Sequence, residues 1–273
     1  MASHVMNCVR FMRAIGPLTG VLTYFNLHRS RNGIARVASP TGDGVVHVRR
    51  GSTDANVFDQ IFVMRDYDVR RFRQWKRVIQ TYNDMVARGP KPLILDFGAN
   101  TGLSARYLSH LFPGASIVAV EPEAGNFSML QDNVRLHPNI RPVRAAISDL
   151  SGQVSITDPK AGNWAFRVRQ VSVDDPDAVP AITVEQARAV AGDHQLFAVK
   201  VDIESAEKQL FASNTGWLDE TAVLMIELHD WMLPWAGTSR TFFRALSGMD
   251  FDFVLAGETA MIFNWSVLLK DRS

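Results

Sequence analysis

The stretch that decides the fold is Pro92-Leu93-Ile94-Leu95-Asp96-Phe97-Gly98-Ala99-Asn100-Thr101-Gly102, in which an apolar run ends in an acid and a glycine turn follows. A second apolar run, residues 118–120, ends in Glu121, nineteen residues after Gly102. An apolar run, a glycine turn, a helical segment and a second run ending in an acid are typical of a βαβ unit that binds a nucleoside. The sequence therefore predicts a nucleoside-binding α/β domain.

Strand-like and helix-like segments alternate on both sides of this unit. The expected strands are residues 34–37, 44–49, 93–97, 116–121, 141–148, 196–201, 222–228, 251–256 and 261–264, with an inserted hairpin at 153–157 and 164–171. The expected helices are residues 67–86, 103–111, 124–136, 183–191 and 241–246. This alternation predicts a mostly parallel sheet with helices on both faces.

The candidate domain boundary is Arg88-Gly89-Pro90-Lys91-Pro92, where two prolines and a glycine end a helical segment. We expect residues 1–88 to form a small α/β attachment that recognises or caps the substrate. We expect residues 89–273 to form the cofactor-binding domain.

The charge distribution and the cysteine content limit the classes of protein to which this chain can belong. Residues 1–95 carry fifteen Lys or Arg against six Asp or Glu, and the remainder carries fourteen against twenty-two. The basic half is expected to be a solvated surface, with an anionic substrate, a membrane surface or nucleic acid as alternative partners. The single Cys8 excludes an internal disulfide and a cysteine zinc cluster, which predicts a cytoplasmic protein.

The N-terminal segment contains an apolar stretch, residues 15–27, that Gly16-Pro17 and Gly20 interrupt. It is too short and too broken to span a bilayer. We expect an amphipathic helix that packs on the body of the protein, with peripheral membrane contact as the alternative.

The glycine turn is suited to a ligand that approaches the backbone closely, because glycine adopts positive φ freely and asparagine tolerates it. The dinucleotide pattern G-x-G-x-x-G is not met, since Asn100 and Leu103 replace its second and third glycines. The Asp96 carboxylate disfavours a pyrophosphate and favours a cation, and S-adenosyl-L-methionine carries a sulfonium and an ammonium. The predicted contacts of this cofactor in the turn are Asp96, Gly98, Ala99, Asn100 and Gly102.

Three further positions complete the predicted cofactor site. Glu121 at the end of the second strand is placed to accept hydrogen bonds from both ribose hydroxyls. Ala146 and Asp149, on and after the third strand, are expected to border the adenine. Asp202, after the fourth strand, lies at the same edge of the sheet.

Four motifs in this order resemble the FkbM family of S-adenosylmethionine-dependent methyltransferases: Asp96 to Gly102, Glu121-Pro122, Ala145 to Asp149, and Lys200-Val201-Asp202-Ile203-Glu204-Ser205-Ala206-Glu207. The resemblance covers about residues 49–264. It implies a Rossmann-like class I methyltransferase fold, with a seven-stranded sheet and a closing antiparallel strand. One departure is Ser205, where the family's D-V-E-G-A-E motif has glycine, a change expected to alter the loop beside the acceptor.

Methyl transfer to a hydroxyl requires alignment of the acceptor and a general base. Acids and a histidine follow the fourth and fifth strands, where open α/β sheets place their ligands. We expect His229 or Asp202 to remove the proton, with Glu204 or Glu227 orienting the base and Asp230 as a further candidate. Asp202, Glu227 and His229 have the chemistry to hold Mg²⁺ or Mn²⁺, but no metal is predicted.

The resemblance implies O-methylation of a saccharide, a glycolipid or a secondary metabolite. The loop Trp231-Met232-Leu233-Pro234-Trp235-Ala236-Gly237 is expected either to stack on a sugar ring or to form a hydrophobic plug. Nucleic acid is disfavoured, because the motif after the fourth strand lacks paired prolines and an aromatic, and Cys8 lies far from the motifs. The alternatives are a cofactor-binding protein without turnover and a nicotinamide-dependent reductase. The oligomeric state is not predicted.

Overall fold

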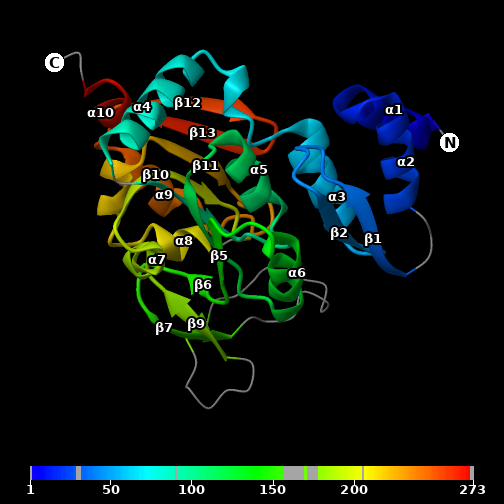
Figure 1. Ribbon diagram of the computed structural model, residues 1–273. Coiled ribbons are helices and arrows are strands. Elements are labelled where there is room, and N and C mark those ends of the chain that lie inside the picture. The colour runs from blue at the N-terminus through cyan, green and yellow to red at the C-terminus, as the bar shows by residue number, and fades with distance from the viewer. Residues whose placement is uncertain are drawn as a thin grey trace.

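The computed structural model describes residues 2–28, 32–89, 91–155, 169–170, 178–204 and 206–270. A seven-stranded sheet with the order β12-β13-β11-β10-β3-β4-β5 forms its centre (Figure 1). The strands run parallel except β13, which is antiparallel to both β11 and β12. This is the mostly parallel sheet with a reversed closing strand that the sequence predicted.

The strands of this sheet are β3 (Lys91–Phe97), β4 (Ser116–Val120), β5 (Ile140–Val143), β10 (His194–Val201), β11 (Val223–Glu227), β12 (Phe251–Ala256) and β13 (Thr259–Asn264). One face packs against α4 (Trp75–Arg88), α5 (Leu103–Leu111), α6 (Ala124–Val134) and α10 (Trp265–Leu268). The other face packs against α7 (Val184–Ala191), α8 (Glu207–Leu210), η4 (Gly216–Glu220) and α9 (Arg240–Leu246).

The two-sided burial explains why the central strands read as unbroken apolar runs. Successive side chains of a strand point to opposite faces, so both sets must be apolar when helices cover both sides. In β3, Ile94 belongs to the core on the α5 side, whereas Leu93 and Leu95 belong to the core on the α7 side. All three side chains are fully buried.

The chain reverses its direction of travel across the sheet between β3 and β10. From β3 it proceeds outward to β4 and β5, and it then returns to β10 and continues to β11 on the opposite side. Such a switch point leaves a crevice beyond the carboxyl ends of the strands, where open α/β sheets bind their ligands. The residues predicted to bind the cofactor follow β3, β4 and β10 at this edge.

The N-terminal part is a helical hairpin followed by a strand hairpin. Its elements are α1 (Ala2–Ile15), α2 (Pro17–Leu27), the antiparallel pair β1 (Gly33–Ala38) and β2 (Val45–Arg50), α3 (Asp54–Phe58), a π-helical turn Asp59–Met64 and the 3₁₀ turn η2 (Val69–Arg71). The single amphipathic helix expected here is divided in two at Gly16-Pro17, because Gly16 takes a φ of 98°. Among the described residues, no helix is long and apolar enough to cross a membrane.

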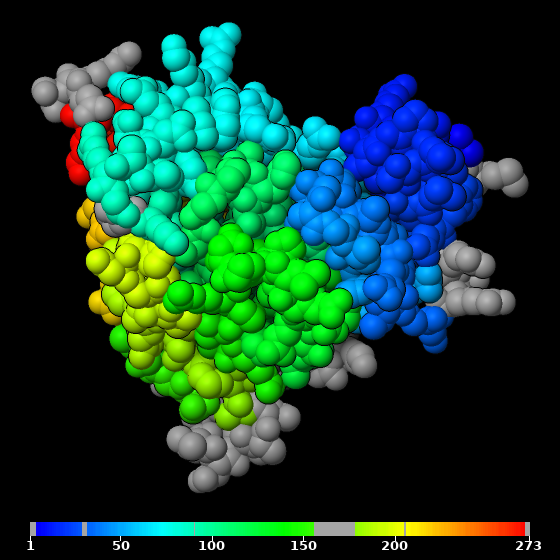
Figure 2. All heavy atoms as spheres, viewed as in Figure 1, coloured from blue at the N-terminus to red at the C-terminus, as the bar shows by residue number. Residues whose placement is uncertain are grey.

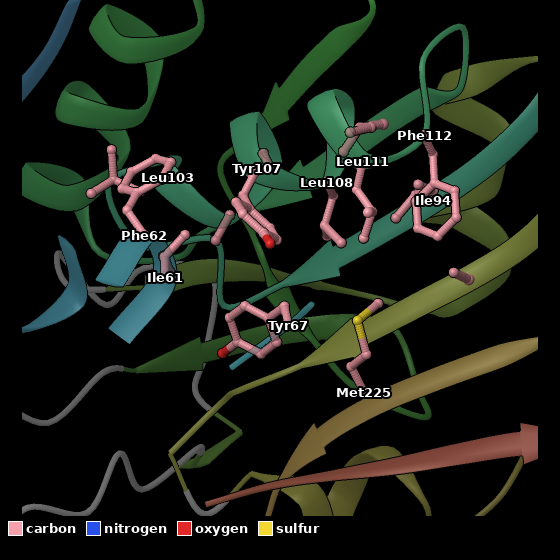
Figure 3. Close-up of a cluster of buried hydrophobic side chains, with 14 of the residues drawn as sticks. Ile61, Phe62, Tyr67, Ile94, Leu103, Tyr107, Leu108, Leu111, Phe112 and Met225 are labelled. Atoms are coloured by element: carbon pink, nitrogen blue, oxygen red, sulfur yellow. The ribbon is translucent and has the colours of Figure 1, made fainter. Parts of the chain in front are cut away.

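The residues around the π-helical turn belong to the same hydrophobic core as the main sheet. Ile61 and Phe62 lie beside Leu103 of α5, and the Tyr67 ring lies between Tyr107 of α5 and the sheet (Figure 3). The helix expected over residues 67–86 begins only at Trp75, since Asp68 instead caps η2 by accepting a hydrogen bond from the Arg70 backbone N–H. The boundary predicted at residue 88 stays a prediction.

The third strand, expected over residues 141–148, is divided between two sheets. β5 ends at Val143, and β6 (Ala146–Ile147) pairs with β9 (Ala178–Ile182) in a four-stranded sheet with β7 (Gly152–Ser155) and β8 (Arg169–Gln170). The apolar pattern continues through both strands, so periodicity does not reveal the change of partner. The expected hairpin at 153–157 and 164–171 lies partly outside the described residues, which omit 156–168 and 171–177.

A buried arginine fastens the strand hairpin to the main domain. The Arg106 guanidinium of α5 is 1% exposed and donates to Asp43 Oδ1 at 2.7 Å and to the Val45 carbonyl at 2.7 Å. Burial raises the pKa of the Asp43 carboxyl, but the hydrogen bonds from Arg106 outweigh burial and lower this pKa to about 2. The pair is therefore charged across the neutral range.

We expect Arg106→Met to destabilise the protein by about 3 kcal/mol, because removing one partner leaves a buried charge uncompensated. Urea unfolding of the full chain measures the change. Arg188→Met, which breaks the exposed pair between Arg188 and Glu220, is the matched control and should cost less than about 1 kcal/mol. Equal effects of the two substitutions would contradict a fastening role for Arg106.

Candidate active site

The turn after β3 has the backbone conformation that the sequence predicted. Gly98, Asn100 and Gly102 take φ values of 72°, 49° and 82°. A Cβ on Gly98 would lie 1.8 Å from the Asp202 carbonyl oxygen, so only glycine fits between β3 and the segment after β10. Gly102 begins α5 as its N-cap residue. The turn thus brings the ends of β3 and β10 into direct backbone contact.

Glu121 closes the turn from the adjacent strand. Its Oε2 accepts the Asn100 backbone N–H at 2.9 Å, and its Oε1 accepts the Glu123 backbone N–H at 3.0 Å. The Asn126 amide lies 3.4 Å from Oε1. Burial raises the pKa of Glu121 to about 7 against these hydrogen bonds, which lower it. The carboxylate is held in one orientation at the rim of a cavity.

This cavity lies beyond the carboxyl ends of β3, β4 and β10. Its acidic lining comes from Glu121, Asp202 and Glu204. The other lining residues are Gly98, Asn100, Pro122, Asn126, Ala146, Ile147, Val154, Ser155, Ile203 and Ala206. No Lys, Arg or His lines it within the described residues, so the cavity favours a cationic ligand.

Asp96 lies beneath the turn and does not line the cavity. Its carboxylate is fully buried, accepts the Ser104 hydroxyl at 2.6 Å and lies 3.2 Å from the Lys200 ammonium. The charge of Asp96 is therefore compensated within the protein. The predicted attraction of Asp96 for a cationic cofactor stays a prediction, and Asp202 and Glu204 are acids that do line the cavity.

Lys200 is a site residue that the sequence analysis did not select. Its ammonium is 2% exposed, donates to the Gly98 carbonyl at 2.7 Å and lies 3.7 Å from Asp202 Oδ2. Burial lowers the pKa of Lys200, but the nearby carboxylates, led by Asp96 and Asp202, outweigh burial and raise it. The available signal was that Lys200 alone interrupts the apolar run of β10.

His229 is fixed between two carboxylates. Its Nδ1 lies 2.7 Å from Oε1 of the buried Glu207, and its Nε2 lies 3.5 Å from Asp202 Oδ1. Burial lowers the pKa of His229, but the Glu207 bond and the neighbouring acids raise it to about 9. His229 is thus an imidazolium at neutral pH. Of the two predicted bases, this arrangement favours Asp202, which also lines the cavity.

Glu227 takes hydrogen bonds from the N-terminal part of the chain. Its Oε1 accepts from Gln60 Nε2 at 2.7 Å, from the Tyr67 hydroxyl at 2.8 Å and from the Thr259 hydroxyl at 3.2 Å. Burial, with the charge of Asp202, raises the pKa of Glu227 to about 7. No motif singled out Gln60 or Tyr67, because their approach to Glu227 depends on the π-helical turn.

Three other predicted positions have different surroundings. Glu204 lines the cavity with a φ of 46°, and burial together with Asp202 raises its pKa to about 7. Asp149 accepts the Ser213 hydroxyl at 2.7 Å and is not among the residues lining the cavity. Asp230 accepts the Ser239 backbone N–H and so closes its own loop. Ser205 lies outside the described residues.

The aromatic loop after β11 is open to solvent. Trp231 is 69% exposed, Trp235 is fully exposed, and the Trp231 ring centroid lies 6.4 Å from that of His229. The loop is therefore not a hydrophobic plug. Its two indoles are free to contact a ligand beside the cavity.

Asp202, Glu227 and His229 each offer one ligand atom within 4.8 Å of the others. Such a set has the chemistry to hold a divalent cation. Lys200 already supplies a positive charge 3.7 Å from Asp202, and Glu227 Oε1 already accepts three hydrogen bonds. The absence of a metal from this site stays a prediction.

The raised pKa of His229 predicts a pH-dependent contribution to stability. A pKa raised from 6.5 to about 9 gives stabilisation that is fully present below pH 6.5 and is lost as the pH rises through about 9. The difference in unfolding free energy between the wild type and His229→Gln should therefore shrink across this window. Urea unfolding at a series of pH values measures it. Glu204 and Glu227 are present in both the wild type and the variant. A difference in unfolding free energy that stays constant across this pH window would refute a charged His229.

No protein-family model matches the chain. A curated protein, the 2-O-methyltransferase NoeI of Sinorhizobium fredii (strain NBRC 101917 / NGR234), is 27% identical over 157 residues. The match covers 52% of this chain and 65% of the relative, slightly less than two thirds of that protein's length.

Two solved structures are similar at low identity. Methyltransferase FkbM from Methylobacillus flagellatus KT has a TM-score of 0.45 and 15% identity, covering 64% of this chain and 43% of that chain. Aeropyrum pernix fibrillarin with natively bound S-adenosyl-L-methionine has a TM-score of 0.37 and 15% identity. The match covers 87% of this chain and 96% of that chain. In sequence, the chain is similar to an O-methyltransferase, in agreement with the FkbM-type methyltransferase that its motifs indicated.

Proposed function

We propose that this protein is an S-adenosyl-L-methionine-dependent O-methyltransferase that acts on a hydroxyl of a saccharide, a glycolipid or a secondary metabolite. The observation that carries the proposal is the position of Asp202. Its carboxylate lines an acidic cavity beside the glycine turn and lies 3.5 Å from a histidine that Glu207 holds in place. A methyl donor and a proton acceptor would therefore meet at one point.

The residues of the cavity fit the proposed cofactor. Glu121 presents a fixed carboxylate to the two ribose hydroxyls, and each bond to such an acceptor contributes about 1.5 to 3 kcal/mol. Ala146, Ile147 and Val154 supply an apolar wall for a flat base. Asp202 and Glu204 supply the negative charge that a sulfonium and an ammonium require. The bound cofactor would provide an electrophilic methyl group on its sulfonium.

Asp202 is the proposed general base. Its carboxylate would take the acceptor's hydroxyl proton as that oxygen attacks the methyl group, which S-adenosyl-L-methionine would supply when bound, with S-adenosylhomocysteine as the leaving group. The His229 imidazolium orients Asp202 from 3.5 Å and is itself positioned by Glu207. Lys200 holds the other Asp202 oxygen from 3.7 Å. Both carboxylate oxygens thus have a cationic neighbour, which fixes the plane of the group.

Three observations support the acceptor class and the setting. Trp231 lies beside His229, both Trp231 and Trp235 are exposed, and flat apolar rings of this kind stack on sugars. The curated relative is named a 2-O-methyltransferase, which favours an oxygen acceptor. Gln60 and Tyr67 reach Glu227, so we include residues 1–88 in acceptor recognition. A cytoplasmic location, based on the single Cys8, is part of the same proposal.

Glu121→Ala should weaken the binding of S-adenosylhomocysteine by about tenfold to a hundredfold, because one or two hydrogen bonds to a charged acceptor are lost. Isothermal titration calorimetry measures the affinity. Glu185→Ala, an exposed acid on α7, is the matched control and should bind normally. Titration with NAD under the same conditions should give no heat. Tight NAD binding would instead favour a reductase.

Asp202→Asn should lower turnover by about 10² to 10⁴ without a comparable loss of S-adenosylhomocysteine affinity, because the amide orients similarly but accepts no proton. Transfer of a labelled methyl group into saccharide and glycolipid fractions of a cell extract measures turnover, and mass spectrometry identifies the methylated acceptor. Cofactor binding without any labelled product would contradict the proposed activity and indicate a binding protein.

A further inference from the structure

The helical hairpin of α1 and α2 stands apart from the seven-stranded sheet. It forms a lobe at one end of the molecule, and no other described part of the chain covers its outer side in this view (Figure 1, Figure 2). The two helices pack closely at Gly20, where a Cβ would lie 2.5 Å from the Met12 backbone nitrogen. Phe11, Tyr24 and Leu27 are buried in the hairpin core. The faces of α1 and α2 that point toward each other are therefore buried by packing within the hairpin.

The opposite face of α2 is apolar and open. Leu18, Leu22 and Phe25 are 73%, 62% and 60% exposed and lie on one side of the helix at i, i+4 and i+7. The helix Pro17–Leu27 contains no charged residue, although an exposed helix face in a soluble protein is normally polar. In α1, Val5 and Met6 are also exposed, at 61% and 72%. Large apolar side chains exposed together on one helix face, as in α2, indicate an interaction site.

The segment that carries this face has side-chain charges of one sign. Residues 1–42 contain five arginines, at positions 10, 13, 29, 31 and 36, and no Asp or Glu. Arg13 and Arg36 are exposed, whereas Arg10 is paired with Asp59. An apolar face on a segment whose charges are all basic complements a lipid surface that has an apolar interior and anionic headgroups.

We propose that the exposed face of α2, formed by Leu18, Leu22 and Phe25, inserts into the interfacial layer of an anionic bilayer, with Arg13 and Arg36 near the lipid phosphates. An eleven-residue helix is about 16 Å long, too short to span a bilayer but sufficient to lie along its surface. The binding does not depend on the proposed methyl transfer. It would hold the protein at a lipid surface.

A second copy of the chain is the less favourable occupant of this face. A symmetric dimer brings the same patch of each subunit together. Here that contact would place the uncompensated arginines of both copies side by side, and like charges at an interface oppose association. An anionic lipid surface removes this repulsion and adds attraction.

Sedimentation of the full chain with phosphatidylcholine vesicles, with and without phosphatidylglycerol, tests the proposal. We expect binding to the anionic vesicles, weaker binding at high salt, and little binding to phosphatidylcholine alone. Leu18→Ser combined with Leu22→Ser and Phe25→Ser should weaken anionic-vesicle binding at least about tenfold. Arg13→Gln with Arg36→Gln should weaken it and reduce its salt dependence.

The matched control is Leu136→Ser with Leu150→Ser and Leu255→Ser, three leucines that are 75%, 54% and 66% exposed elsewhere on the protein. This variant should bind vesicles like the wild type. Circular dichroism and S-adenosylhomocysteine affinity verify that each variant is folded. Failure of the folded wild type to bind anionic vesicles, or equal loss in both triple variants, would overturn the proposal. Dimerisation that the α2 variant alone abolishes, without vesicle binding, would assign the face to a second copy.

Discussion

The site depends on one buried ammonium group. Lys200 lies at the end of β10, where its Nζ donates to the Gly98 carbonyl and contacts Asp96 and Asp202. A buried cation is costly unless it is paired and hydrogen-bonded, and here both conditions are met. The same contacts hold the turn after β3 against the segment after β10. Because the two halves of the sheet meet between these strands, Lys200 helps to hold the two sides of the crevice together.

The acids around Lys200 have separate environments and so separate tasks. Asp96 is consumed by internal pairing, whereas Asp202 faces the cavity and keeps an accessible carboxylate. Its carboxylate neighbours raise the pKa of His229 to about 9. A charged His229 suits the role of orienting Asp202 in the mechanism that we propose. The pairing of charges within the site thus gives Asp96 a structural role and leaves Asp202 available for the proposed proton transfer.

The sequence could predict the sheet because its strands are buried on both faces and its turns are marked by glycine and proline. It could also predict the Gly98 turn and the position of the Glu121 carboxylate, because each of them directly follows a strand that the sequence marks clearly. It did not predict the change of partner between β5 and β6, since no glycine or proline turn separates Val143 from Ala146 in the sequence. Nor did it show that Asp149 bonds to Ser213 instead of lining the cavity.

By itself, then, the sequence determined the order of elements, the glycine turn after β3 and the acids that follow each strand. The tertiary structure decided which acids lie beside a cation, because that depends on distances across the sheet. Lys200 is 104 residues from Asp96 along the chain and 3.2 Å from it in space (200 − 96). Gln60 and Tyr67 reach Glu227 in the same way, through folding of a segment without a recognisable motif. Periodicity encodes which face of an element is buried, but only packing fixes which buried groups touch.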